Sequence, residues 1–162
     1  MNAQEIVKTE KAKISESGFA AFVVAFFAAA IKIVVSVIRA FGIFDDGSTA
    51  ETIAQDVGYL FSSVVVTAVL IVLGIMFKRI SKCGSPFIKE SVKSIRLIAV
   101  LLFANSVAGP LAETVTADII NSNLKHLFVI NESYLFFGLI FLFIGQLFSY
   151  GCALQKEYDE TI

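Results

Sequence analysis

Four apolar stretches dominate the chain, and short polar segments separate them. The stretches cover residues 18–39, 57–77, 97–116 and 134–154. A helix needs about 20 mostly apolar residues to cross a hydrocarbon core roughly 30 Å thick, and lipid offers no partner for unpaired backbone groups. We therefore predict an all-α fold, an integral membrane protein with an antiparallel bundle of four transmembrane helices.

The polar segments complete the predicted domain organisation. Residues 1–17 form an N-terminal segment, residues 18–154 a single four-span domain with a loop at 78–96, and residues 155–162 an acidic tail. Composition agrees with a membrane protein, since 57% of the residues are apolar. The two cysteines, Cys83 and Cys152, are too far apart in sequence for a redox or zinc motif, so we expect reduced packing residues.

Loop charges predict the orientation of the spans. Loop 78–96 carries Glu90 as its one acid and six cations: Lys78, Arg79, Lys82, Lys89, Lys93 and Arg96. The loop before the second span contains Asp45, Asp46, Glu51 and Asp56 and no cation. Because cations resist translocation, loop 78–96 and both termini are expected in the cytoplasm.

The start of the chain has a second interpretation. Lysines before the first apolar stretch, followed by Ala28–Ala30, also fit a cleaved signal peptide. The apolar pattern continues past that point through Ile31–Ile38, and an even number of spans agrees with the charge of every loop. A first transmembrane helix is therefore favoured.

One face of the first span carries small and charged residues. At 100° per residue this face contains Ala21, Ala25, Ala28, Lys32, Ser36 and Arg39. Small residues let helices approach closely, whereas a Lys near mid-span is usually placed against a partner or a wet cavity. Glu113 in the third span matches the depth of Lys32, so we predict a Lys32–Glu113 ion pair. The alternative is that Lys32 extends outward to the membrane surface.

Other polar residues fall inside the third and fourth spans. Pro110 lacks a backbone N–H, so the third span should kink, and Asn105 or Ser106 is expected to satisfy the freed carbonyl groups. Gln146 lies beside a stripe of small residues in the fourth span and is expected to donate an interhelical hydrogen bond.

The two charged cytoplasmic segments are candidate contact sites. Ser85 and Pro86 have the residue types of a helix start, after which basic side chains would face anionic lipid headgroups. The candidate contact residues of the loop are Arg79, Lys82, Lys89, Lys93 and Arg96. The tail acids Glu157, Asp159 and Glu160 are expected to dock loosely onto these cations, because exposed ion pairs contribute only about 0–1 kcal/mol each.

Two segments carry a resemblance to a known family. They are SPFIKESVKSIRLIA at Ser85–Ala99 and GCALQKEYDETI at Gly151–Ile162. The chain resembles the bacterial four-span membrane proteins catalogued as domain of unknown function 2975, with Ser91 and Tyr158 at positions where that family usually has Asn. The resemblance implies residence in a bacterial cytoplasmic membrane, and that family is often described beside a small helix-turn-helix regulator.

Enzyme chemistry finds no support in the residues. His126 is the one histidine, and no Ser-His-Asp set, metal-ligand spacing or phosphate-binding loop occurs, so we expect no catalysis, cofactor or metal. A net charge of −1 gives no reason to expect nucleic acid. The favoured function is a non-enzymatic sensor, immunity or regulatory component acting through a protein partner or homo-oligomer. The alternative is a small transporter or channel subunit that oligomerises around the polar residues of the bundle.

Overall fold

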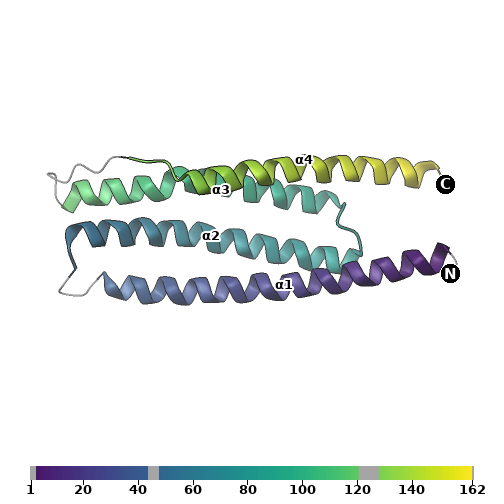
Figure 1. The fold of residues 1–162 in the computed structure, drawn as a ribbon, viewed down its shortest axis with the longest axis horizontal. Helices are drawn as coiled ribbons and strands as arrows, with labels where there is room; N and C mark the ends of the chain where they lie inside the picture. The colour runs from purple at the N-terminus through teal and green to yellow at the C-terminus, as the bar shows by residue number, and fades with distance from the viewer. Residues whose placement is uncertain (1–2, 44–47, 121–127, 162) are drawn as a thin grey trace.

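A computed structural model of the chain describes residues 3–43, 48–120 and 128–161, and within those ranges all regular structure is helical. The helices are α1 (Ala3–Gly42), α2 (Ala50–Cys83), α3 (Lys89–Ile120) and α4 (Glu132–Thr161) (Figure 1). The predicted all-α class is confirmed. The loop residues Asp45, Asp46 and His126 lie outside the described residues.

Each helix is longer than the span predicted within it. At 1.5 Å per residue the 40 residues of α1 extend about 60 Å and the 30 of α4 about 45 Å, against roughly 30 Å for a bilayer core. All four helices are long and apolar enough to cross a membrane. The segments predicted as terminal extensions are helical from Ala3 and as far as Thr161.

Local signals account for the limits of α2. The hydroxyl of Thr49 accepts a hydrogen bond from the N–H of Thr52, which caps the first turn. Gly84 ends the helix with a left-handed φ of 63°, and its N–H donates to the carbonyl of Ile80. Glu51 in the first turn and Lys82 in the last complement the helix dipole.

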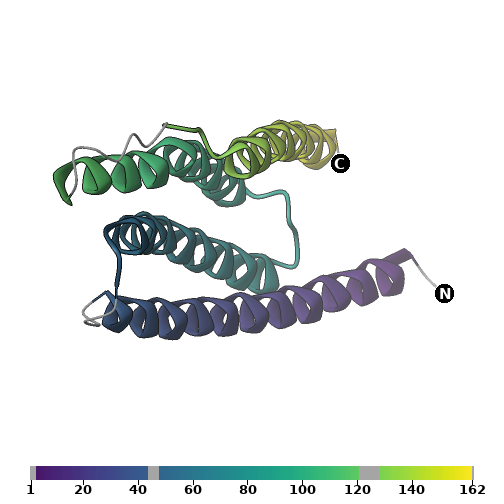
Figure 2. The same cartoon turned by 60° about the vertical axis from the view of Figure 1, so that its left-hand side comes forward.

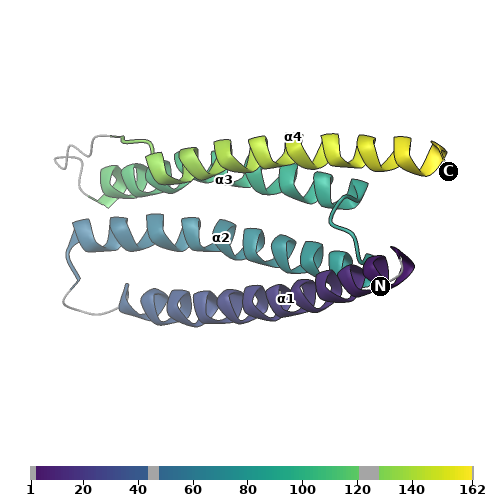
Figure 3. The same ribbon diagram turned by 45° about the vertical axis from the view of Figure 1, so that its right-hand side comes forward.

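The four helices form an open row. α1 packs on α2, α2 on α3 and α3 on α4, and the described residues make no backbone contacts between other pairs of helices. Figures 1 and 2 place α1 and α4 at opposite edges of the row, and Figure 3 shows both termini at the same end.

The open row differs from the closed arrangement that an antiparallel four-helix bundle usually has. A closed bundle would bring the small-residue stripes of all four helices to one centre. Each stripe instead packs on a neighbouring helix, and lipid can solvate the remaining apolar faces about as well as another helix would.

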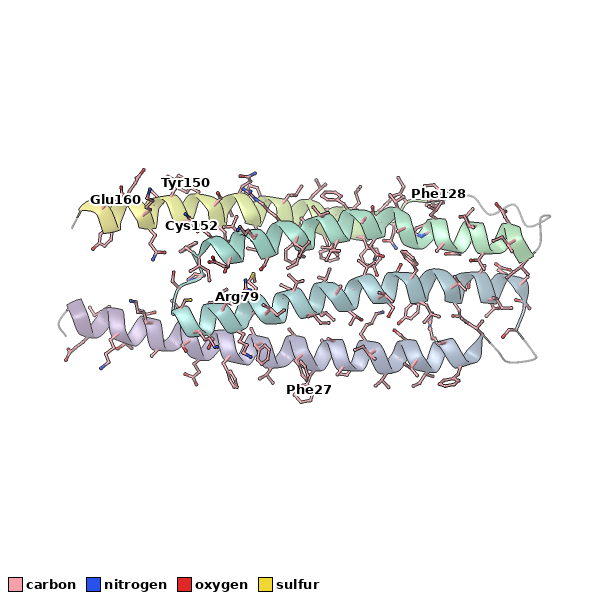
Figure 4. The ribbon with its side chains drawn as sticks, turned by 180° about the vertical axis from the view of Figure 1, so that it is seen from behind. Phe27, Arg79, Phe128, Tyr150, Cys152 and Glu160 are labelled. Atoms are coloured by element: carbon pink, nitrogen blue, oxygen red, sulfur yellow. The ribbon has the colours of Figure 1, made fainter. Side chains whose placement is uncertain are left out.

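Small residues bring α1 and α2 together as expected. Ala25 and Ala29 of α1 are buried, whereas Phe26 and Phe27 are exposed, and Figure 4 shows Phe27 pointing away from α2. At Gly18 a Cβ atom would lie 3.0 Å from the backbone N of Ser81, so the two backbones nearly touch. Of the predicted packing face, Ala25 is buried and Ala21, Ala28, Lys32 and Ser36 are half-buried, whereas Arg39 is exposed.

The contact between α2 and α3 is equally close. A Cβ atom on Gly58 would lie 2.8 Å from Cβ of Glu113, and one on Gly109 would overlap the side chain of Ser62. Glycine at both positions is what allows the two helices to approach at this level.

Apolar side chains from all four helices gather toward one end of the row. Met76, Ile80 and Ile95 are buried there, and Ile14 of α1 and Phe148 of α4 pack against them. We call this the basic end; it comprises the two termini, the turn at residues 84–88 and the cations of residues 78–96. The opposite end, with the connections at residues 43–49 and 121–131, is the acidic end.

The fourth helix begins beside the middle of the third. The backbone N–H of Asn131 donates to the carbonyl of Ser106 at 2.9 Å, 14 residues before α3 ends at Ile120. At 1.5 Å per residue, α3 therefore extends about 21 Å beyond the start of α4. Ser106 lies four residues before Pro110, so its carbonyl is the acceptor that the proline leaves free.

Candidate functional site

A lysine in the first helix is held by a tyrosine of the second. Nζ of Lys32 donates a hydrogen bond to the Tyr59 hydroxyl at 2.9 Å and lies 4.3 Å from the centre of the ring. Both contacts stabilise the ammonium group, the first as a charge-assisted hydrogen bond and the second as a cation–π interaction. Tyr59 is therefore the partner that the partly buried Lys32 requires.

A second cation shares the same ring. The guanidinium of Arg39 lies 3.9 Å from the centre of Tyr59, and its Nη1 is 3.5 Å from Oδ1 of Asp56. Lys32, Tyr59, Arg39 and Asp56 thus form a polar cluster between α1 and α2 in the half of the row near the acidic end. We call these four residues the tyrosine cluster.

An apolar groove adjoins the tyrosine cluster. It encloses ≈ 520 Å³ between α1 and α2 and contains the hydrogen-bonded pair Ser36 and Ser63. The rest of its lining is mainly aliphatic, including Ile33, Val64 and Ile71. The groove is suited to hydrocarbon rather than to a polar solute.

The predicted Lys32–Glu113 ion pair is not formed. Lys32 is bound to Tyr59, and α2 lies between α1 and α3, so matching depth did not make the two residues neighbours. Glu113 instead packs against Gly58. Its side chain also lines a cavity of ≈ 430 Å³ at the acidic end, together with Glu132 and the segment 129–131.

Asn105 and Gln146 have different positions from those expected. Asn105 is fully buried, and neither atom of its amide has a hydrogen-bond partner among the described residues. The hydroxyl of Ser106 donates to the carbonyl of Phe103, while the backbone of Asn131 satisfies the carbonyl freed by Pro110. Gln146 is exposed, because α4 turns Gly138 and Gly145 rather than this side chain toward α3.

The basic residues of the loop spread over several faces of the row. The five predicted contact residues are all exposed: Arg79, Lys82, Lys89, Lys93 and Arg96. Arg79 and Lys93 line one cavity between α2 and α3. The stem of Arg96 packs at Gly145 on α4, and the ammonium of Lys78 lies 5.5 Å above the ring of Phe22 on α1.

The turn before α3 contacts the last turns of α4. The rings of Phe87 and Phe148 are 5.5 Å apart, and a Cβ atom on Gly151 would overlap Phe87. The Ser85 hydroxyl donates to Oε1 of Gln155 at 3.3 Å and accepts from the N–H of Phe87. The helix start predicted at Ser85 and Pro86 is wrong, because these residues form the turn and α3 begins at Lys89. The two segments that carry the family resemblance thus meet in the fold.

The predicted docking of the acidic tail onto the loop cations is not observed for Glu160. This carboxylate lies 3.4 Å from Nζ of Lys156, one turn earlier in α4, and Figure 4 shows it near the free end of the helix. The reason is that the tail continues α4 as a helix instead of folding back over the loop. Glu157 is exposed, and the side chain of Asp159 lies outside the described part of the chain.

Sequence reasoning missed two contacts, those of Tyr59 with α1 and of Phe87 with α4. Tyr59 was not among the predicted site residues, although it follows Asp56 by three residues and therefore lies on the same face of α2. Phe87 follows the predicted cap, and Gly151 has no side chain to obstruct it. The sequence did contain a signal for this contact: a large residue, Phe87, in one family-like segment and a glycine, Gly151, in the other.

No group of His, Cys, Asp and Glu suited to a metal ion occurs among residues 3–43, 48–120 and 128–161. Searches for related proteins find no matching family model, no matching curated protein and no matching solved structure. The resemblance to the four-span family stays a prediction that depends on the two motifs.

Proposed function

We propose that this chain is a non-enzymatic multi-pass protein of a bacterial cytoplasmic membrane, and that its basic end faces the cytoplasm and binds a protein partner. The charge difference between the two ends supports the orientation. The function is that of a sensor, immunity or regulatory component that passes a change in the membrane to that partner.

The observation that carries the proposal is the construction of the basic end. Helical extensions of α1 and α4 emerge at this end, and the turn at residues 84–88 lies between them in sequence and contacts α4. Lys11 of α1 covers Gly84, so the first helix also reaches this turn. A tilt of either outer helix would therefore move exposed charged groups on the cytoplasmic side.

In-cell photo-crosslinking tests the proposal. A photoreactive amino acid placed at Lys89 or Tyr158, both exposed, should capture one protein partner in the organism that makes the chain. The double variant Lys82→Gln with Lys89→Gln should lose the product formed from Tyr158. The matched variant Lys8→Gln with Lys13→Gln, which removes the same charge from α1, should retain it. Products with lipid alone, or equal loss in both variants, would overturn the proposal.

A second function, a transporter or channel subunit, is favoured by one observation. Lys32 has no carboxylate partner among the described residues, and the fully buried Asn105 has an unsatisfied amide. The open row encloses no path by itself, so several copies would have to surround one. Lys32→Ala should then abolish solute flux in proteoliposomes while membrane insertion is retained, and unchanged flux would remove this candidate.

A further inference from the structure

A cavity between α2 and α3 at the basic end is lined by both charged and aliphatic side chains. It has a volume of ≈ 400 Å³ and is lined by Val72, Ile75 and Arg79 of α2 and by Glu90, Lys93, Ser94 and Leu97 of α3. Figure 4 shows Arg79 on the side of α2 that faces α3. Two helices thus bring one guanidinium and one ammonium group to the same cavity.

The charged and apolar residues occupy different depths. Val72 precedes Arg79 by seven residues, about 10 Å along the helix, and Leu97 follows Lys93 by one turn. Because the helices are antiparallel, both changes run the same way, with cations toward the basic end and aliphatic side chains toward the middle of the row. A phospholipid has this same order of phosphate followed by acyl chain.

The two cations are available to a ligand. The ion pairs Lys13–Glu10, Arg39–Asp56 and Lys156–Glu160 include no residue of this cavity. Glu90 is the one acid in the lining, so the lining carries a net charge of +1 (two cations less one acid). That charge complements a lipid with one net negative charge, and the Ser94 hydroxyl adds a hydrogen-bond donor.

The neighbouring cations belong to other surfaces. Lys78 lies over Phe22 of α1, and Arg96 packs at Gly145 of α4, although both are at the same level as Arg79 and Lys93. Loop charge alone would attract anionic lipid diffusely. Because these side chains point to different surfaces, the cavity is the place where two cations, Arg79 and Lys93, lie next to an apolar lining. We call Val72, Ile75 and Leu97 the apolar floor of the cavity.

We infer that this cavity is a binding site for an anionic phospholipid, with the phosphate diester between Arg79 and Lys93 and an acyl chain along Val72, Ile75 and Leu97. The inference depends on the membrane residence in the proposed function and not on the protein partner. It gives the sensor a lipid ligand at the contact between the two central helices.

Native mass spectrometry of the purified full-length chain, released from mixed micelles, tests the inference. With equal phosphatidylglycerol and phosphatidylcholine, the wild-type protein should retain phosphatidylglycerol preferentially. The variant Arg79→Gln with Lys93→Gln should lose about fivefold of that preference for each cation removed. The matched variant Lys78→Gln with Arg96→Gln removes the same charge at the same level and should keep the preference.

Two further experiments distinguish binding of a whole phospholipid from binding of a phosphate group alone. Leu97→Trp keeps both cations but fills the apolar floor, and it should reduce retention of phosphatidylglycerol as strongly as the double variant does. Inorganic phosphate at millimolar concentration should not displace the lipid. Equal loss in both double variants, unchanged retention in Leu97→Trp, or displacement by inorganic phosphate would each overturn the site. Protein-partner capture uses Lys82 and Lys89, so the two proposals can fail separately.

Discussion

The backbone N–H of Asn131 donates to the carbonyl oxygen of Ser106, the acceptor that Pro110 leaves without its helical donor. The side-chain oxygen of Asn131 meanwhile accepts from the N–H of Tyr134 and caps α4. Asn131 thus caps the fourth helix and also satisfies the free carbonyl of the third. The position of α4 along α3 is fixed at this point.

Replacing Pro110 should loosen this junction. Pro110→Ala restores a backbone N–H that competes for the Ser106 carbonyl, so the amide of Asn131 should exchange with solvent about fivefold faster, in line with loss of a hydrogen bond worth roughly 1 kcal/mol. Hydrogen exchange of the protein in nanodiscs measures this rate. Pro86→Ala, at the opposite end of the row, should leave the rate unchanged, and an unaltered Asn131 in Pro110→Ala would contradict the role.

The pairing of Lys32 with Tyr59 can be measured by a double-mutant cycle. Lys32→Met and Tyr59→Leu should show a coupling energy of about 0.5–2 kcal/mol, because the hydrogen bond and the cation–π contact are lost together. Tyr59→Phe should retain part of the coupling, since the ring remains. Lys32→Met and Glu113→Gln should be additive within about 0.5 kcal/mol. Reversible unfolding in mixed micelles gives all of these values, and coupling to Glu113 instead of Tyr59 would reverse the assignment.

Of the two glycines at the contact between α2 and α3, Gly58 should be more sensitive to substitution than Gly109. Gly58→Ala should destabilise the protein by about 1–3 kcal/mol, because its new methyl group meets Cβ of Glu113 and the backbone of Gly109. Gly109→Ala should cost less, since the Ser62 hydroxyl can rotate away. Gly42 has open space around it and provides the control, with Gly42→Ala within about 0.5 kcal/mol of wild type. Equal effects at positions 42 and 58 would show that the close contact is absent.

Phe87 should hold the turn at residues 84–88 against α4. Phe87→Ala removes its ring contact with Phe148 and its cover over Gly151, for a loss of roughly 2 kcal/mol, below the 3–5 kcal/mol of a fully buried Phe. Spin labels at Cys83 and at Gln155 should then report a broader distance distribution. Phe136→Ala removes an exposed ring of α4 and should leave the distribution narrow. No broadening in Phe87→Ala would mean that the turn is held by other contacts.

The sequence was sufficient to predict the four helices and to predict which face of a single helix packs on protein. The periodicity of Ala25 and Lys32 identified the face of the first helix that packs on protein, since that face depends only on the helical repeat. The partner of Lys32 depends on which helices are neighbours, and hydropathy does not encode this. Matching depth favoured Glu113, whereas the order of the helices in the row makes Tyr59 the partner.

The same distinction applies to the proline in α3 and to the tail. Pro110 identified the carbonyl that would lose its donor, but Asn131 lies 21 residues further along and only the start of α4 brings it there. For the tail, charge complementarity suggested docking onto the loop. Because α4 continues to the end of the tail, Glu160 pairs with Lys156 of the same helix. The contact between the loop and α4 is made by Phe87 at Gly151 and is apolar.

The open row also has a consequence for biosynthesis. Among the described residues, backbone contacts between helices join only helices that follow one another in the chain, so every such interface can form as soon as its second helix leaves the ribosome. No helix has to wait for a distant partner, and the sequence separation between contacting residues stays small, which favours rapid assembly. The last helix, docked at Ser106 through Asn131, completes a structure whose earlier parts are already in place.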